Sequence, residues 1–319
     1  MAKQYIQSVN TQSLLYLGNS GSQKTIDQLE QIFDYLFPLV KDTVMALKPI
    51  SIHGRAAFAP DFLFRIVLLS HLYNLSERET VDLLADRISF RKFVGINYEE
   101  QIPDRRVIRT FLHSLYKKNI GLEFITKVIS DLCSKGIVIS KGKIVDSTIV
   151  EAHGKKTPQE HRRDQDANFT KKHSTTYFGY KGHVIIEKKN KIITAVEVTT
   201  ASVSDYDPVD SLLKQDKTPT KALYGDKGYQ DTINEGLRES RGIKSKIMHK
   251  KPKLKEMQTK DHERNTLISK IRSRVEHIFG RTKNEFQLTK TRFYTLEKNA
   301  GFLTFIFGLY NVKVALKLI

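Results

Sequence analysis

The sequence has 319 residues, of which 39% are hydrophobic, enough for one large domain or two ordinary ones with a buried core. Its 53 Lys and Arg against 35 Asp and Glu leave a net charge of +18, which favours nucleic acid as a partner over anionic lipid or a merely solvated surface. A single cysteine, Cys133, excludes an intrachain disulfide and a thiolate zinc site, as is typical of a reducing compartment.

The first 140 residues show helical periodicity and little strand signal. Apolar residues recur on one helix face from Leu29 to Phe37, and a second helix is expected over residues 61–75. Ser76 and Glu79 have the spacing of a capping box, and Asp104 is expected to cap a later helix. We predict an all-helical domain over residues 1–140. It is either a plain bundle or contains a helix-turn-helix that binds DNA ends, to which three arginines would be suited: Arg105, Arg106 and Arg109.

After residue 140, strand and helix signals alternate, and this part holds 36 of the basic residues but only 21 of the acidic ones. Strands are expected over residues 143–150, in a pair joined near Asn190, and over 222–224 and 245–248. Helices are expected after a cap at Asp205 and over residues 229–241, 262–283 and 300–319. We therefore predict an α/β domain with a mixed sheet flanked by helices over residues 141–319.

Two polar segments of this domain are expected to be loops. Residues 153–176 follow the first strand, and they should place Asp164 and Asp166 on the surface. Residues 249–260 contain five lysines and one glutamate. Such segments are either solvated or follow the phosphates of a nucleic acid, so the second one supplies candidate DNA contacts: Lys250, Lys251 and Lys253.

Three carboxylates are candidates for chemistry, although each also has an ordinary structural explanation. Asp146 lies in an apolar strand, where a charge requires a compensating hydrogen bond or metal ion. Asp226 follows a strand and a glycine, where open α/β sheets bind ligands, but it could also cap a helix. Glu276 shares one helix stripe with Arg272 and Lys283, which would equally produce an exposed ion pair.

Together these residues resemble the signature of the DDE transposases, whose catalytic domain is ribonuclease-H-like. Arg272, Glu276 and Lys283 match the R-x3-E-x6-K pattern of bacterial insertion-sequence transposases of groups four and five. That pattern usually has a Tyr three residues before the Arg, and Ser269 stands there in this chain. The 50 positions from Asp226 to Glu276 leave no room for the β-rich insertion of longer members, so the chain is most similar to the insertion-sequence-five type.

The resemblance implies a DNA transposase that cleaves insertion-sequence ends and joins the 3′ ends to target DNA. Asp146, Asp226 and Glu276 would be the catalytic residues and the ligands of two Mg2+ or Mn2+ ions, and Arg272 and Lys283 would contact phosphates. The expected partner is double-stranded DNA, both terminal inverted repeats and target, bound by a homodimer. With no export signal or membrane span in view, we expect a bacterial cytoplasmic enzyme, nucleoid-associated when bound.

Two other functions remain open at this stage. One is a related metal-dependent endonuclease that cuts DNA without strand transfer. The other is a non-catalytic DNA-binding repressor, for which buried carboxylates within a basic surface would serve little purpose.

Overall fold

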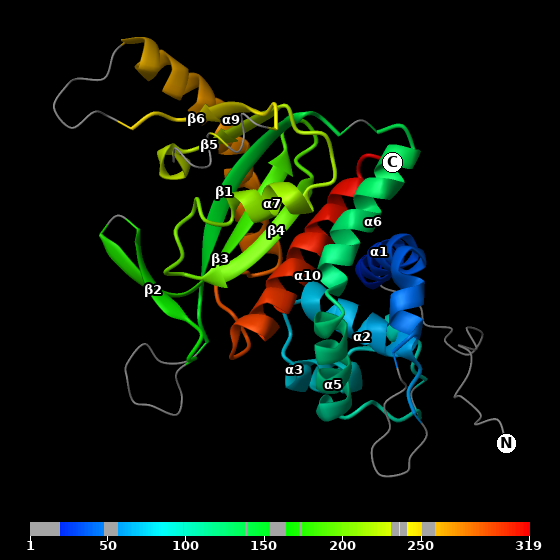
Figure 1. The fold of residues 1–319 in the computed structure, drawn as a ribbon. Coiled ribbons are helices and arrows are strands. Elements are labelled where there is room, and N and C mark those ends of the chain that lie inside the picture. Colours follow the sequence, from blue (N-terminus) through cyan, green and yellow to red (C-terminus); the bar gives the residue numbers. More distant parts are fainter. Residues whose placement is uncertain are drawn as a thin grey trace. The chain divides into compact units, whose positions relative to one another are not determined.

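The computed structural model describes residues 20–47, 57–97, 99–137, 139–153, 164–172, 174–230, 236, 241–250 and 259–319. The chain forms two compact units, Met1–Ile120 and Gly121–Ile319. Described elements of the first unit are all helices, whereas the second contains a six-stranded mixed sheet with helices (Figure 1). The fold class predicted from the sequence, α/β and ribonuclease-H-like after a helical region, is confirmed.

The first unit is a set of helices around an aromatic core, in which Phe33 contacts the rings of Phe64 and Phe93. The predicted capping box is present, because the Ser76 hydroxyl accepts from the Glu79 amide and the Glu79 carboxylate accepts from the Ser76 amide. The described helices of this unit are α1 (Ser20–Met45), α2 (Pro60–Leu72), α3 (Glu77–Asp86), α4 (Ile88–Val94) and α5 (Arg105–Lys117).

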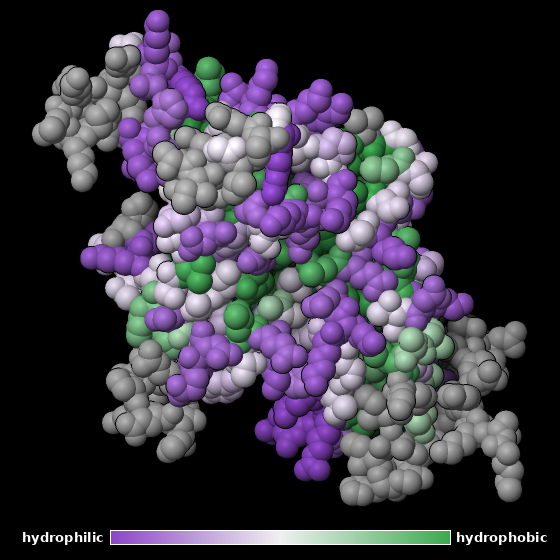
Figure 2. Space-filling model, viewed as in Figure 1, coloured by the Kyte–Doolittle hydropathy of each residue, from purple (hydrophilic) through white to green (hydrophobic). Residues whose placement is uncertain are grey.

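Helix α5 is strongly amphipathic. Asp104 caps its N-terminus as predicted, accepting a 2.7 Å hydrogen bond from the amide of Arg106. The apolar residues from Val107 to Leu115 face the core, while Arg105, Arg106 and Arg109 are exposed. Hydrophilic residues gather over α3 and α5 on the face shown in Figure 2. The first unit therefore presents a basic stripe on one exposed helix.

The sheet of the second unit is organised around its longest strand, β3. One edge of β3 pairs antiparallel with β1, and its other edge pairs with β2 and then with β4. Beyond β1, the strands β5 and β6 continue the sheet in parallel. The strands are β1 (Gly142–Glu151), β2 (Asn168–Lys172), β3 (Thr175–Glu187), β4 (Ile193–Thr200), β5 (Ala222–Gly225) and β6 (Lys244–Ile247).

Helices pack on both faces of this sheet. On one face α7 packs in a core with Val145 of β1 and Ile185 of β3. On the other, Phe307 of α10 lies against Gly182, and the Asn311 side chain bonds both backbone groups of Ile193. Helix α9 packs against β5 and β1. The helices of this unit are α6 (Ile120–Ser134), α7 (Val209–Gln215), the short 3-10 helix η1 (Lys227–Tyr229), α9 (Thr259–Glu285) and α10 (Leu296–Ala315).

Three local expectations differ from the structure. The polar segment after β1 contains strand β2, whose residues are mostly exposed and so lack an apolar alternation. Asp164 in the same segment is buried, because its carboxylate accepts a 2.6 Å hydrogen bond from the Tyr180 hydroxyl. Pro208, and not Asp205, occupies the N-cap position of helix α7, which has no side-chain capping hydrogen bond. Most of the helix expected over residues 229–241 lies outside the described residues.

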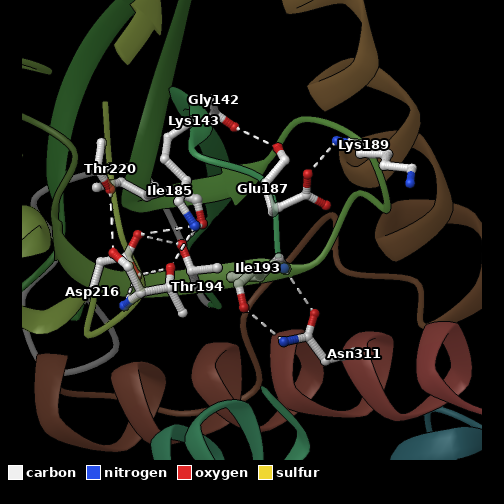
Figure 3. Close-up of polar contacts among 12 residues, drawn as sticks. Gly142, Lys143, Ile185, Glu187, Lys189, Ile193, Thr194, Asp216, Thr220 and Asn311 are labelled. Carbon is white, nitrogen blue, oxygen red and sulfur yellow. Dashed lines mark hydrogen bonds and ion pairs between the residues drawn. The ribbon is translucent and has the colours of Figure 1, made fainter. Parts of the chain in front are cut away.

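A closed polar network lies between the first residues of β1 and the end of α7 (Figure 3). The Lys143 ammonium is fully buried, lies 3.5 Å from the Asp216 carboxylate and donates to the Thr218 hydroxyl. Asp216 also accepts hydrogen bonds from the Thr194 and Thr218 hydroxyls and the Thr218 amide. Burial lowers the pKa of Lys143, an effect that the neighbouring Asp216 opposes. Each charge here has a partner within the fold.

Helix α10 is mostly apolar, and most of its residues are buried against the sheet and neighbouring helices. Within the described ranges, no helix combines the length and apolar character that a bilayer crossing requires.

Candidate active site

Parallel pairing of β1 and β5 brings the two predicted aspartates together. Ile144 of β1 pairs with Tyr224 of β5, and each aspartate follows its strand's paired residue by two positions. Asp146 therefore lies inside β1 next to Asp226, which stands just beyond the carboxyl end of β5. This is the edge at which open α/β sheets bind their ligands.

Arg272 of α9 connects these aspartates to Glu276. Its Nη1 atom lies 3.6 Å from Oδ2 of Asp146 and 3.3 Å from Oδ2 of Asp226. Its Nη2 atom lies 3.4 Å from Oε1 of Glu276, one helical turn further along α9. One guanidinium group thus contacts all three predicted carboxylates, which come from a strand, a strand end and a helix.

Each aspartate uses one carboxylate oxygen for the backbone and turns the other towards Arg272. Oδ1 of Asp146 accepts a 2.9 Å hydrogen bond from the Ser147 amide. Oδ1 of Asp226 accepts a 2.7 Å bond from the Gly228 amide and so caps η1. A Cβ atom at Gly228 would lie only 2.9 Å from this oxygen, so a larger residue at this position would require the Asp226 carboxylate to shift. Asp226 therefore caps η1 and is also one of the three carboxylates that contact Arg272.

The three carboxylates differ in exposure and in electrostatic state. Side-chain exposure rises from 15% for Asp146 to 38% for Asp226 and 65% for Glu276. Burial raises the pKa of Asp146 to about 6, against the opposing effect of Arg272 and of the Ser147 amide. The nearby charges of Asp226 and Asp205 raise this pKa further. Asp146 is thus a poorly compensated buried acid, despite its guanidinium contact.

The donor set of this site consists of carboxylate oxygens, the ligands that hard divalent cations prefer. Among the described residues, no three His, Cys, Asp or Glu side chains are already arranged around one point as a metal-binding group. The carboxylates instead surround the Arg272 guanidinium, with Oδ2 of both aspartates on the same nitrogen. Their chemistry and their shared cation fit a site for divalent ions, with Arg272 as the cation that compensates them in this structure.

Comparison with protein families identifies the chain. A family model described as "Transposase DDE domain" matches residues 140–312, more than half of the chain. The chain belongs to the DDE transposase family. A second model, described as "Transposase domain (DUF772)", matches residues 19–114 of this transposase. No solved structure matches the chain. Members of this family cleave and transfer DNA, so the protein is an enzyme and DNA is its partner.

The basic residues predicted to contact phosphates have different surroundings in this transposase. Arg272 contacts all three carboxylates. Lys283 is half-buried, and its pKa is lowered by burial and by the neighbouring charge of Lys172 on β2. The exposed Lys250 donates from its amide to Gln230, just after η1. Ser269, at the position of the usual tyrosine, is exposed. Lys251 and Lys253 lie outside the described residues.

A second polar group beside Asp146 was missed by the sequence reasoning, which placed Asp205 at a helix cap. Oδ1 of Asp205 accepts a 3.0 Å hydrogen bond from the Ser147 hydroxyl and lies 3.0 Å from the Lys181 ammonium. His183, on the same strand as Lys181, is hydrogen-bonded through Nε2 to the Thr199 hydroxyl. In the sequence, the local indication of this polar group is the serine that directly follows Asp146.

Proposed function

We propose that this transposase cleaves DNA at the ends of an insertion sequence and joins the 3′ ends to target DNA with divalent metal ions. Asp146, Asp226 and Glu276 are the proposed catalytic residues and the ligands of two Mg2+ or Mn2+ ions. The observation that supports this assignment is the shared contact of these three side chains with Arg272, although they come from distant parts of the chain.

Bound ions of this kind activate a water or 3′ hydroxyl and stabilise the leaving oxygen of an in-line displacement. The chain's own residues prepare the site for them. Backbone amides hold Oδ1 of each aspartate, and Oδ2 of each faces Nη1 of Arg272. Exposed Glu276 leaves the site open to a polymer substrate.

Arg272 has a second proposed role when DNA arrives. In the structure its guanidinium compensates three carboxylates, which metal ions would compensate in its place. A guanidinium released from this role is suited to bidentate contact with a phosphate. We assign the same phosphate-binding role to Lys283 and to the lysines of the second polar segment, Lys250, Lys251 and Lys253.

The proposal extends to the first unit and to the assembly. The exposed stripe of Arg105, Arg106 and Arg109 on α5 is suited to binding the terminal inverted repeats. The spacing of Arg272, Glu276 and Lys283, with the short segment after Asp226, supports membership of the insertion-sequence-five group. A homodimer on DNA would bring two element ends together, as joining both ends requires.

The test uses the purified chain, Mg2+ or Mn2+, and an oligonucleotide duplex carrying the terminal inverted repeats that flank the gene. We expect nicked and joined products on a denaturing gel, and none when EDTA is present. Asp226→Ala and Glu276→Ala should each lower the rate at least about a hundredfold, because each removes a group that stabilises the transition state through the metal site.

Two matched variants control for general effects of removing negative charge. Asp207→Ala and Glu263→Ala each remove an exposed carboxylate, the latter from the same helix as Glu276, and should retain the wild-type rate. Strand transfer that persists in Asp226→Ala or Glu276→Ala would refute the assigned roles. Nicks without joined products would identify an endonuclease instead.

A further inference from the structure

Ser147 of β1 holds the side chain of Asp146 and is itself held by a carboxylate from another part of the chain. Its backbone amide donates a 2.9 Å hydrogen bond to Oδ1 of Asp146. Its hydroxyl donates a 3.0 Å hydrogen bond to Oδ1 of Asp205, which lies 58 positions further along the chain, in the segment after β4. Ser147 therefore connects the most buried acid of the active site to Asp205.

Asp205 is fixed in its turn by Lys181 of β3. The Lys181 ammonium lies 3.0 Å from Oδ1 of Asp205 and donates a 2.7 Å hydrogen bond to the carbonyl of Val203. The Lys181 side chain is only 9% exposed, so its charge depends on these two partners. Lys181 and Ser147 thus meet at one oxygen of Asp205, which links β3, β1 and the segment after β4.

The part of β1 that contains Asp146 and Ser147 has a paired strand on one side. Its pairing with β3 is continuous there, whereas the parallel pairing with β5 covers Gly142 to Ile144. In the described part of the chain, the next bridge on that second side joins Glu151 to Lys290. Backbone with a neighbour on one side is held by fewer hydrogen bonds, so side-chain bonds have a larger influence on its position.

The bond from Ser147 to Asp205 is more than an anchor for the segment after β4 requires. Lys181 already holds that segment through the Asp205 carboxylate and the Val203 carbonyl. The additional bond goes to the residue of β1 whose amide fixes Oδ1 of Asp146. Carboxylates that bind metal ions are commonly oriented by hydrogen-bond partners of this kind.

We propose that Asp205 is a positioning residue of the reaction, which acts through Ser147 to hold the Asp146 carboxylate in the orientation that binds a divalent ion. With Oδ1 of Asp146 fixed by the Ser147 amide, Oδ2 is left to face a cation, which is Nη1 of Arg272 in this structure. The inference rests on the proposed function, because it takes Asp146 as a metal ligand. It gives the ion pair of Asp205 and Lys181 a role in the reaction.

The decisive variant is Ser147→Ala, which removes the link to β1 and leaves the ion pair of Asp205 with Lys181 in place. Mn2+ binding by the purified chain is measured by electron paramagnetic resonance of the free ion. We expect Ser147→Ala to raise the Mn2+ Kd about tenfold or more, the usual effect of removing a partner of a metal ligand. Ser147→Thr keeps the hydroxyl and should bind Mn2+ with nearly the wild-type Kd. A Ser147→Ala chain that binds Mn2+ as tightly as wild type would overturn the inference.

Asp205→Asn tests the other end of the link, with Asp207→Asn as the matched control that removes an exposed carboxylate two residues away. We expect Asp205→Asn to weaken Mn2+ binding at least as much as Ser147→Ala does, and Asp207→Asn to leave it unchanged. Because Asp205 acts through Ser147, combining Ser147→Ala with Asp205→Asn should weaken binding no further than Asp205→Asn alone. Additive losses, or a loss confined to Asp205→Asn, would mean that Asp205 acts by its charge alone and would overturn the inference.

Folding and DNA cleavage are measured on the same variants. Asp205→Asn leaves the buried Lys181 with the Val203 carbonyl and should lower stability, whereas Ser147→Ala should keep the wild-type circular dichroism spectrum. Weaker Mn2+ binding together with an altered spectrum in Ser147→Ala would count as damage to the sheet and overturn the inference. DNA cleavage by the wild type, with Mn2+ binding insensitive to Ser147→Ala, refutes the positioning role alone. Mn2+ binding that is sensitive to Ser147→Ala, without DNA cleavage by the wild type, refutes the proposed function.

Discussion

Two of the charged residues of strand β1, Lys143 and Asp146, lie three positions apart, and their surroundings differ sharply. Lys143 is fully buried and meets Asp216 and Thr218 in a network where Asp216 accepts three further hydrogen bonds (Figure 3). Asp146 shares one guanidinium with two other acids at 3.3 to 3.6 Å, longer than a good hydrogen bond, and its pKa is raised to about 6.

The difference separates a structural charge from a functional one. The Lys143 network is complete inside the protein, so the fold depends on it and no ligand is needed. Asp146, Asp226 and Glu276 carry more negative charge than Arg272 compensates, and Glu276 is exposed. A cation from solution can therefore still stabilise these carboxylates. Stability measurements on the metal-free protein should therefore respond in opposite directions at the two positions.

The largest expected effect is at Lys143. Lys143→Met leaves the Asp216 carboxylate buried without its cation, and breaking a buried pair in this way costs about 3–5 kcal/mol of unfolding free energy. Urea denaturation followed by circular dichroism measures it. Lys143→Met combined with Asp216→Leu removes both charges and should recover a large part of the loss. Equal instability of the single and double variants would mean that packing, and not charge pairing, matters here.

The next effect concerns His183, a buried residue beside the active site to which we assign a structural role, as for Lys143. Burial lowers its pKa from 6.5 to about 4. Between these values the unfolded chain takes up a proton that the folded chain refuses, so stability falls as the pH falls from 6.5 to 4. The loss of unfolding free energy should reach at most about 3.4 kcal/mol, from 1.36 kcal/mol per pKa unit.

Urea denaturation from pH 7.5 down to pH 4 tests this dependence. His183→Gln removes the titrating ring and should show a flatter profile over the same interval, whatever its stability at pH 7.5. An equally steep profile in the variant would assign the acid sensitivity to other groups.

How much of these two clusters the sequence could predict depends on how far apart in the chain the interacting residues lie. Helices, caps and the strand around Asp146 follow from local sequence patterns, and a charged residue within an apolar strand can be recognised in the sequence itself. The triple contact of Arg272 depends on tertiary packing, as does the link from Asp205 to Ser147. Only the order and spacing of the family signature placed the three carboxylates together.

The missed elements have the same physical cause. Strand β2 has mostly exposed side chains, so its sequence lacks the alternation that marks a half-buried strand. Asp164 was expected on the surface because its neighbours are polar. It is buried by partners far along the chain, the Tyr180 hydroxyl and the Thr295 amide. Burial caused by distant partners leaves no local pattern.

A smaller effect of opposite sign is expected at Asp146. Its folded pKa of about 6 lies above the ordinary value of 3.8, so the ionised form is disfavoured in the folded state. This cost is fully present above pH 6 and disappears as the pH falls towards 4. Asp146→Asn should therefore raise the free energy of unfolding by at most about 3 kcal/mol at pH 8 in EDTA, and by much less at pH 4. A variant less stable than wild type at pH 8 would place Asp146 with the structural charges instead.

The smallest effect on the unfolding free energy is expected at Glu276. It is the sharpest test of the comparison, because this substitution should abolish activity and leave stability unchanged. Its side chain is 65% exposed, and its one contact with Arg272 has the geometry of a helix-surface pair. Such pairs are worth a few tenths of a kcal/mol, so Glu276→Gln should change the unfolding free energy by less than about 0.5 kcal/mol. If its folding were impaired as strongly as that of Lys143→Met, Glu276 would belong with the structural charges. An unchanged denaturation midpoint beside lost DNA cleavage would instead show that the fold does not need this carboxylate and the reaction does.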